Sequence, residues 1–195
     1  SGNQVYAKET VIDQNNSTTV LNEPVISNRS LDYTDLNNWF AGDPILGQAV
    51  ETATEYHLDI PQVDIHSAVV RVGGTDLNKS LIQYPGTALP GQPGAPVIFG
   101  HSILRQFYNP SEKNPKRYGS IFSKIMTLQP GDEIYLTHDN VKYTYRVVSN
   151  HEVKPSDTFI LAQRYDARQL KLVTCVPEGT TLRRGVVVAE LIKGN

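Results

Sequence analysis

Apolar and polar residues alternate with a period of two along most of the chain after residue 54, which is typical of half-buried β-strands. The clearest run is 141–147, where Val, Tyr, Tyr and Val occupy every second position. A turn signal at His138-Asp139-Asn140 precedes it. Further strand-like runs predict at least seven strands in all: 56–60, 63–72, 97–100, 133–136, 141–147, 169–174 and 184–192.

Helical spacing is rare by comparison. Apolar residues at 121, 122, 125 and 128 predict one short helix that ends before Pro130-Gly131, and a second short helix is expected within 31–50, before Pro44. Residues 85–96 are rich in proline and glycine, and residues 105–119 are polar; both read as loops. Many short strands with Gly/Pro turns predict an all-β barrel or sandwich.

The first 53 residues differ from the rest. Residues 1–30 are polar without a sustained period, which indicates an extended or mobile lead segment. Trp39, Phe40, Ile45 and Leu46 are apolar enough that we expect the extension 1–53 to pack partly on the domain formed by 54–195. We expect that packing to brace the domain rather than to cover its site.

Composition narrows the function. A length of 195 residues with 39% hydrophobic residues predicts one domain with some extra chain, or at most two small domains. A net charge of −2 gives no basic patch for nucleic acid. One cysteine excludes an intrachain disulfide, and no Cys/His set or acidic run has metal-site spacing. No apolar run approaches the roughly 18–20 residues of a membrane span, and no signal peptide is present. Ser1-Gly2 reads as a tag remnant, so we interpret the chain as a trimmed ectodomain.

Three residues at strand ends carry the candidate chemistry. Cys175 closes the run 169–174 on the face of Lys171 and Val173, opposite Leu170 and Leu172. A lone cysteine is most often a buried structural thiol, but Pro177-Glu178-Gly179 follows at once and puts this one at the mouth of a turn. That position favours a reactive thiol.

His101 directly follows the run 97–100, where Gly100 permits close backbone approach, whereas the other four histidines lie in polar segments. Arg183 and Arg184 open the last run and face opposite sides of it, and periodicity alone does not choose between them. A thiol, an imidazole and a guanidinium can form a cysteine nucleophile with its acid/base and an anion stabiliser.

These residues lie in segments that resemble the sortase family of cysteine transpeptidases. The matching segments occur in the family's order over about residues 54–192: 60–65, 84–87, Val97-Ile98-Phe99-Gly100-His101-Ser102, 131–133, Leu172-Val173-Thr174-Cys175-Val176-Pro177 and 184–188. The resemblance implies a closed eight-stranded β-barrel with short helices. It implies Cys175 as nucleophile, His101 as general acid/base and Arg184 as the carbonyl or oxyanion contact, with Thr174, Ser102 and Val173 as substrate-binding residues.

The resemblance also implies an activity. A sorting signal like Leu-Pro-x-Thr-Gly would be cleaved after threonine, held as a thioester and passed to an amine of a peptidoglycan precursor or a pilin lysine, without a cofactor or metal. We expect a monomer that acts at the outer face of the bacterial cytoplasmic membrane. The subclass stays open: Asp43-Pro44-Ile45 is similar to the Asp-Pro-aromatic lid of pilin-building members but lacks the aromatic, and Ser102 stands where those members commonly have arginine.

Two alternatives remain from other classes. In L,D-transpeptidases the histidine shortly precedes the cysteine, whereas 74 positions separate His101 from Cys175. A non-catalytic surface-binding module on the same fold is the second alternative, and the presence of all three reactive residue types disfavours it.

Overall fold

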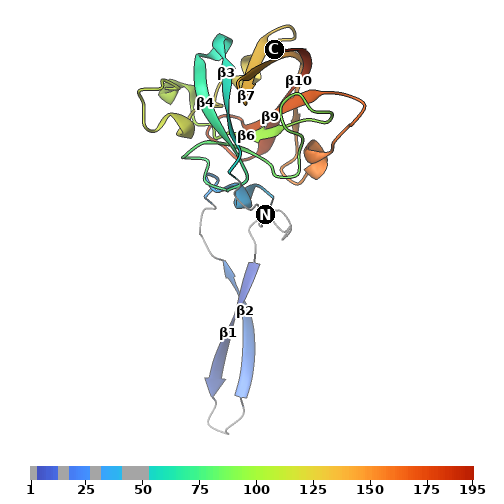
Figure 1. The fold of residues 1–195 in the computed structure, drawn as a ribbon. Helices are drawn as coiled ribbons and strands as arrows, with labels where there is room; N and C mark the ends of the chain where they lie inside the picture. Colours follow the sequence, from blue (N-terminus) through green and yellow to red (C-terminus); the bar gives the residue numbers. More distant parts are fainter. Residues whose placement is uncertain (1–3, 13–17, 27–31, 41–52) are drawn as a thin grey trace. The chain divides into compact units, whose positions relative to one another are not determined.

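The computed structural model describes residues 4–12, 18–26, 32–40 and 53–195 (Figure 1). The chain divides into two compact units, 1–32 and 33–195. In the first, β1 (Gln4–Ile12) and β2 (Thr18–Ile26) form an antiparallel pair with Gln4 opposite Ile26. Sequence analysis predicted an extended segment but not this pairing. The β-branched runs 10–12 and 18–20 are the strand signal that the polar composition obscured.

The second unit contains a closed barrel of eight strands in the order β10-β8-β7-β3-β4-β5-β6-β9, which confirms the predicted architecture. The strands are β3 (Glu55–Ile60), β4 (Ile65–Val72), β5 (Leu81–Gln83), β6 (Val97–Phe99), β7 (Glu133–His138), β8 (Val141–Val153), β9 (Gln169–Val176) and β10 (Arg183–Gly194). Two neighbouring pairs, β4–β5 and β6–β9, are parallel, and the others are antiparallel. Periodicity missed β5 because three residues are too short to show alternation.

The hairpin of β7 and β8 follows its sequence closely. Asp139 and Asn140 both have positive φ (50° and 63°) between paired His138 and Val141, as a two-residue type I′ turn requires. Tyr145 and Val147 are buried, as the alternation predicts. β8 runs on to Val153, beyond the predicted end, and this extension pairs with the beginning of β10.

The predicted helix over 120–128 is wrong. That segment consists of turns followed by the 3-10 turn η6 (Ile125–Thr127). The four apolar residues on which the helical spacing rested, at 121, 122, 125 and 128, are all buried, so the spacing predicted burial correctly. The hydroxyls of Ser120 and Ser123 instead accept hydrogen bonds from Asn109 N (3.1 Å) and Ile103 N (2.9 Å), which fasten the turns to neighbouring loops.

The other helical elements of the described residues are also 3-10 turns: η1 (Leu36–Trp39), η3 (Pro61–Val63), η4 (Arg105–Phe107), η5 (Arg117–Gly119) and η7 (Thr158–Leu161). η1 stands within the range predicted for the second helix, 31–50, and residues 31 and 41–50 of that range lie outside the described residues. No helix of the described part of the chain is long and apolar enough to cross a membrane.

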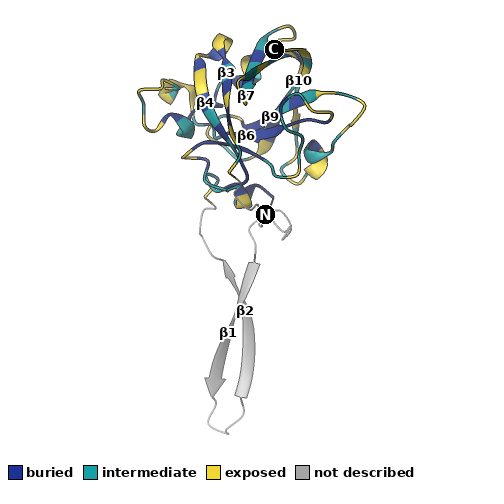
Figure 2. Cartoon of the chain, in the orientation of Figure 1, coloured by how far each residue is buried: buried dark blue, intermediate teal, exposed yellow. Residues whose placement is uncertain are grey.

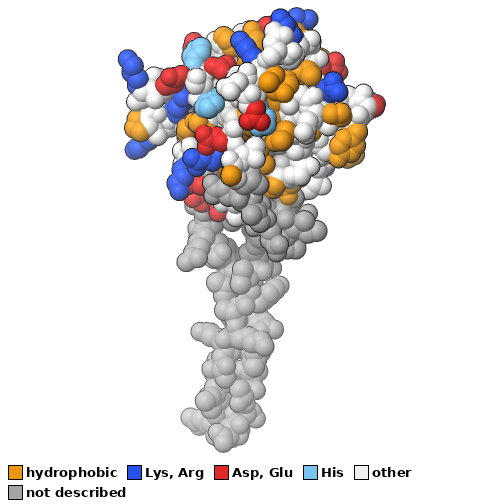
Figure 3. Space-filling view, in the orientation of Figure 1, with side chains coloured by type: hydrophobic (Ala, Val, Ile, Leu, Met, Phe, Trp, Pro, Cys, Tyr) orange, Lys and Arg blue, Asp and Glu red, His pale blue; other side chains and the backbone are white. Residues whose placement is uncertain are grey.

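Two apolar clusters stabilise this unit. One fills the barrel and includes Ile98, Leu172 and Val187. The other lies on the opposite face of the same strands, where β6 and most of β9 are buried (Figure 2). It joins strand residues to the segment 33–40: Val97, Phe99, Val173, Cys175, Val186, Leu36, Trp39 and Phe40, among others. Acidic and basic side chains are interspersed on the face in Figure 3, as the small net charge leads one to expect.

Candidate active site

Cys175 and Arg184 are direct cross-strand neighbours. The antiparallel register of β9 and β10 pairs Arg184 with Cys175, and directly opposed residues project their side chains on the same side of a sheet. Cys175 and Val186 belong to the outer cluster, whereas Leu170, Leu172 and Val187 point into the barrel. The face predicted for Cys175 is therefore confirmed. The register also shows which of the two arginines lies on the face of the thiol, a question that periodicity left open. Arg184 lies on the outer face with Cys175 and is 3% exposed. Arg183 is exposed and forms an ion pair with Glu152.

His101 is aligned with Cys175 by the parallel pairing of β6 and β9. Phe99 pairs with Val173, so two further residues on each strand bring His101 level with Cys175. Hydrogen bonds continue this alignment past the last strand pair. Gly100 N donates to Val173 O (3.1 Å), Thr174 Oγ1 donates to Gly100 O (2.9 Å), and Ser102 Oγ donates to Cys175 O (2.7 Å).

Gly100 is required by the packing at this point. A Cβ there would lie 2.3 Å from Phe122 Cδ2 and 2.7 Å from Leu81 Cδ2, and neither side chain has room to move within the core. Next to it, His101 O accepts a hydrogen bond from Phe122 N (3.0 Å). The glycine therefore lets the chain approach the core closely enough to hold His101 in position, as the sequence indicated.

The hydroxyls of Ser102 and Thr174 are used within the protein. Ser102, Thr174 and Val173 are all buried, and each hydroxyl donates to a main-chain carbonyl of the opposite segment. In this conformation they stabilise the alignment of the histidine segment with the cysteine strand. Their contact with substrate stays a prediction.

Arg184 is held by the segment that precedes the barrel. Its Nη2 donates to Trp39 O (3.3 Å), and its Cζ lies 4.9 Å from the centre of the Trp39 ring. Its Nη1 donates to Thr181 O (3.2 Å) and Arg183 O (3.3 Å). The Tyr33 ring lies 5.8 Å from the same guanidinium. Sequence analysis missed the partners Tyr33 and Trp39 because 145 residues separate Trp39 from Arg184, and no local pattern reports such a contact.

Burial governs the chemistry of the thiol. Cys175 is 2% exposed, and burial raises its pKa to about 11, while the positive charge of Arg184 acts in the opposite direction. In this conformation the thiol is therefore protonated at neutral pH. A base must take the proton, or the thiol must become exposed, before it can attack.

Residues 33–40 pack against the barrel and contact Arg184 of the site. Leu36 N donates to Thr75 O, Leu77 N donates to Thr34 O (both 2.8 Å), and Trp39 is 1% exposed. Sequence analysis favoured bracing over covering of the thiol. These contacts brace the barrel, and the Trp39 ring also lies over the Arg184 guanidinium, whereas covering of Cys175 stays a prediction. The Asp43-Pro44-Ile45 motif lies outside the described residues.

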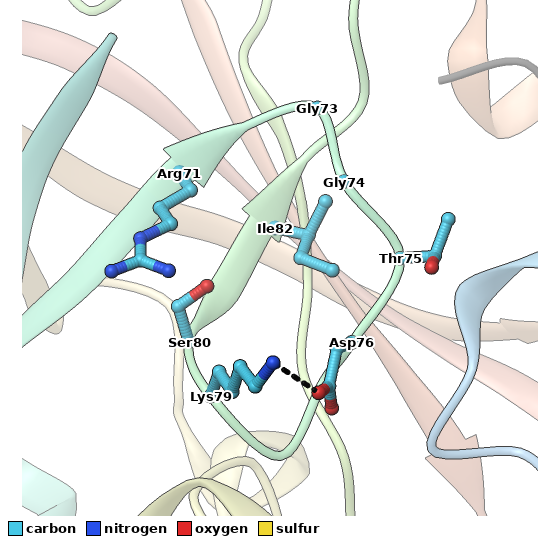
Figure 4. A pocket seen from close by; sticks show the side chains of 8 residues that line it. All are labelled: Arg71, Gly73, Gly74, Thr75, Asp76, Lys79, Ser80 and Ile82. Carbon is cyan, nitrogen blue, oxygen red and sulfur yellow. Dashed lines mark ion pairs between the residues drawn. The ribbon is translucent and has the colours of Figure 1, made fainter. Parts of the chain in front are cut away.

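A cavity of about 310 Å³ is lined mainly by the loop that joins β4 to β5, whose Thr75 contacts the segment 33–40 (Figure 4). Arg71 faces it from β4, and Lys79 forms an ion pair with Asp76 (3.4 Å) across its lower rim. None of its described lining residues is Cys175, His101 or Arg184, so it lies apart from the candidate chemistry.

The family model described as the Sortase domain matches residues 58–192, most of the chain. The chain belongs to the sortase family. Sortases are cysteine transpeptidases, and the chain is 34% identical over 158 residues to sortase A of Listeria monocytogenes, covering 77% of this chain and 65% of that one. It is 27% identical over 138 residues to sortase A of Bacillus anthracis, covering 69% of this chain and 58% of that one. The chain thus spans little more than half the length of some curated sortases that it matches.

Solved sortases share the fold. A lid mutant of sortase A from Corynebacterium diphtheriae is 28% identical with a TM-score of 0.59, covering 75% of this chain and 74% of that one. A sortase D5 transpeptidase from Clostridium perfringens is 26% identical with a TM-score of 0.59, covering 82% of this chain and 96% of that one. Sortases named A, C and D all match at low identity, so the subclass stays open.

Proposed function

We propose that this sortase cleaves a sorting signal of the Leu-Pro-x-Thr-Gly type and transfers the new carboxyl end to an amine. The observation that carries the proposal is the position of Cys175, which is opposed across the sheet by Arg184 and aligned along the parallel strand pair with His101. A thiol, a fixed cation and an imidazole then converge from three strand ends, an arrangement suited to acyl transfer through a covalent intermediate.

Each residue has a distinct role in this proposal. The Cys175 thiolate attacks the threonine carbonyl, and the Arg184 guanidinium donates hydrogen bonds to the negative oxygen that forms. His101 gives its proton to the leaving amine, which leaves a thioester on Cys175. The incoming amine loses a proton to His101 as it attacks the thioester carbonyl, and the C–S bond breaks to release the Cys175 thiolate beside the protonated imidazole.

We further propose that residues 54–195 form the catalytic domain, with 1–53 as its N-terminal extension, and that Thr174, Ser102 and Val173 lie along the substrate path. Sortases are typically anchored in the membrane and act at its outer face, and we place this protein there. The acceptor is an amine of a peptidoglycan precursor or of a pilin subunit. The protein acts as a monomer on signal-bearing surface proteins.

A library of Leu-Pro-x-Thr-Gly-like peptides, read by mass spectrometry, tests the proposal. With an added amine acceptor such as triglycine, we expect a product in which the acceptor replaces the residues after threonine. Without it, slow hydrolysis at the same bond is expected. Cleavage at other bonds, or equal hydrolysis with and without amine, contradicts a transpeptidase.

A further inference from the structure

The loop that joins the two chemistry-bearing strands carries an ion pair to the histidine segment. We call residues 177–182, between β9 and β10, the β9–β10 loop. Arg105, in η4 and four positions after His101, approaches Glu178 of this loop with Nε 2.6 Å and Nη2 2.5 Å from the same carboxylate oxygen. The pair is the shortest ion pair among the described residues and spans 73 positions in sequence.

The backbone of the loop packs closely at the same point. Gly179 has φ +77°, and a Cβ on it would lie 3.2 Å from Leu104 Cγ and 3.4 Å from Leu104 N. Thr180 closes a turn on Pro177 through its N (2.9 Å) and its hydroxyl (2.8 Å). The first half of the loop is therefore a compact turn seated against the residues that follow His101.

The second half of the loop reaches Arg184. Thr181 O is one of the three carbonyls that accept hydrogen bonds from the guanidinium. When the segment 33–40 moves away to admit a substrate, Trp39 O leaves with it, and Thr181 O and Arg183 O remain. The orientation of Arg184 in the open site then depends on a loop whose fixed point is the Glu178 carboxylate.

We propose that Arg105 and Glu178 are positioning residues for acyl transfer. Their ion pair fixes the β9–β10 loop against the histidine segment, so that Thr181 O holds Arg184 toward the reacting carbonyl. The inference rests on the proposed function. An ion pair that is partly exposed to solvent contributes little to folding stability, so its effect falls on geometry rather than on stability. A small displacement of a catalytic group lowers the reaction rate strongly.

Glu178→Gln removes the charge with little change of shape and is the test variant. On a Leu-Pro-x-Thr-Gly peptide we expect kcat to fall about 10-fold with KM within about twofold, because orientation is lost rather than ground-state binding. Glu133→Gln is the matched control: its carboxylate forms an ion pair with Arg146 (3.2 Å) of similar exposure on β7 and β8, away from the site. It leaves kcat unchanged, and both variants keep the wild-type melting temperature.

The charge-exchanged double variant, Arg105→Glu with Glu178→Arg, distinguishes an effect on the position of the loop from an effect of the local electrostatic field. It restores the bridge but reverses the local charges, so recovery of most of the lost kcat supports positioning. No recovery, or an unchanged kcat in Glu178→Gln, overturns the proposal.

Hydrogen exchange gives a readout that does not depend on any substrate. Glu178→Gln is expected to speed amide exchange from 178 to 184 and from 102 to 107, whereas Glu133→Gln leaves both segments unchanged. If the wild-type protein fails to turn over the peptides, the proposed function fails, and exchange still decides the role of the ion pair. Unchanged exchange in Glu178→Gln contradicts it.

Discussion

At the scale of single residues, the site combines a suppressed nucleophile with a permanent cation. Burial holds the pKa of Cys175 at about 11, and Arg184 offsets part of that effect from across the strand pair. A thiol with this pKa is ionised at pH 8 to only about one part in a thousand. In this conformation the thiol is therefore a poor nucleophile, and its reactivity depends on exposure of Cys175 and on His101 as the base.

The reaction of the thiol with iodoacetamide tests this suppression. In the folded protein the rate is expected to keep rising with pH beyond 10, whereas in the urea-unfolded chain it levels off near the ordinary value of 9. The folded state favours the neutral thiol. Its stabilising effect is therefore intact below pH 9 and is lost as pH rises from 9 toward 11, because the unfolded thiol ionises first. A folded-state plateau at or below pH 9 contradicts the burial argument.

The two adjacent arginines provide an internal comparison. Arg184→Ala is expected to reduce the rate of acylation about 10²–10³-fold, the usual loss for one oxyanion donor. Arg184→Lys recovers little of it, since lysine lacks the planar fork. Arg183→Ala has a mild effect, because Arg183 is exposed and pairs with Glu152 (3.1 Å). Single-turnover kinetics on a sorting-signal peptide measures all three, and the reverse ranking would assign the role to Arg183.

At the scale of elements, we expect the segment 33–40 to control access to the site. It joins the loop after β4 by paired backbone hydrogen bonds, and it brings Trp39 over the guanidinium of Arg184. The Trp39 ring also meets Phe99 of β6 edge-on at 5.5 Å, so one residue contacts two strands of the site. Cys175 is 2% exposed in the same cluster as Trp39, so we expect a substrate carbonyl to reach it only when this packing loosens.

Removing the Trp39 ring tests the cover. Trp39→Ala is expected to speed the labelling of Cys175 by a bulky maleimide at least about tenfold, since the ring closes over the cluster that holds the thiol. Ile134→Ala is the control, because it destabilises the barrel interior without uncovering the site. Labelling is measured well below each variant's melting temperature. Equal labelling rates in Trp39→Ala and wild type would leave the segment as a brace alone.

A buried hydrogen bond links two strands of the barrel. Tyr56 of β3 donates its hydroxyl to Gln83 Oε1 of β5 at 2.6 Å, and both residues are buried. Tyr56→Phe leaves that oxygen unsatisfied and is expected to cost about 1–3 kcal/mol of unfolding free energy. Urea denaturation measures this, with Tyr135→Phe on the half-buried face of β7 as the control. A loss no larger than the control's would show that the bond contributes nothing net.

At the scale of the whole molecule, the sequence predicts the features that appear as a local periodic pattern or a local motif. The alternation in β8 and β9 assigns the barrel faces, and the motif around Cys175 and His101 identifies the family. Three features of the fold could not be predicted from such patterns. The 3-10 turns of 120–128 share their burial pattern with a helix; β5 is too short to show a period; and the β1–β2 pair is polar. Contacts such as Trp39 to Arg184 and Arg105 to Glu178 join distant positions, which only tertiary structure brings together.

The most direct test of the whole account is the mass of the acyl-enzyme. Wild-type protein mixed with a Leu-Pro-Glu-Thr-Gly peptide, without an amine acceptor, is quenched in acid and examined intact and after digestion. The account predicts an added Leu-Pro-Glu-Thr acyl group on the peptide that contains Cys175. The group is released by hydroxylamine, absent in Cys175→Ala and strongly reduced in His101→Ala. Two results would contradict the account: cleavage of the substrate peptide by the Cys175→Ala variant, or an acyl group attached to a residue other than Cys175.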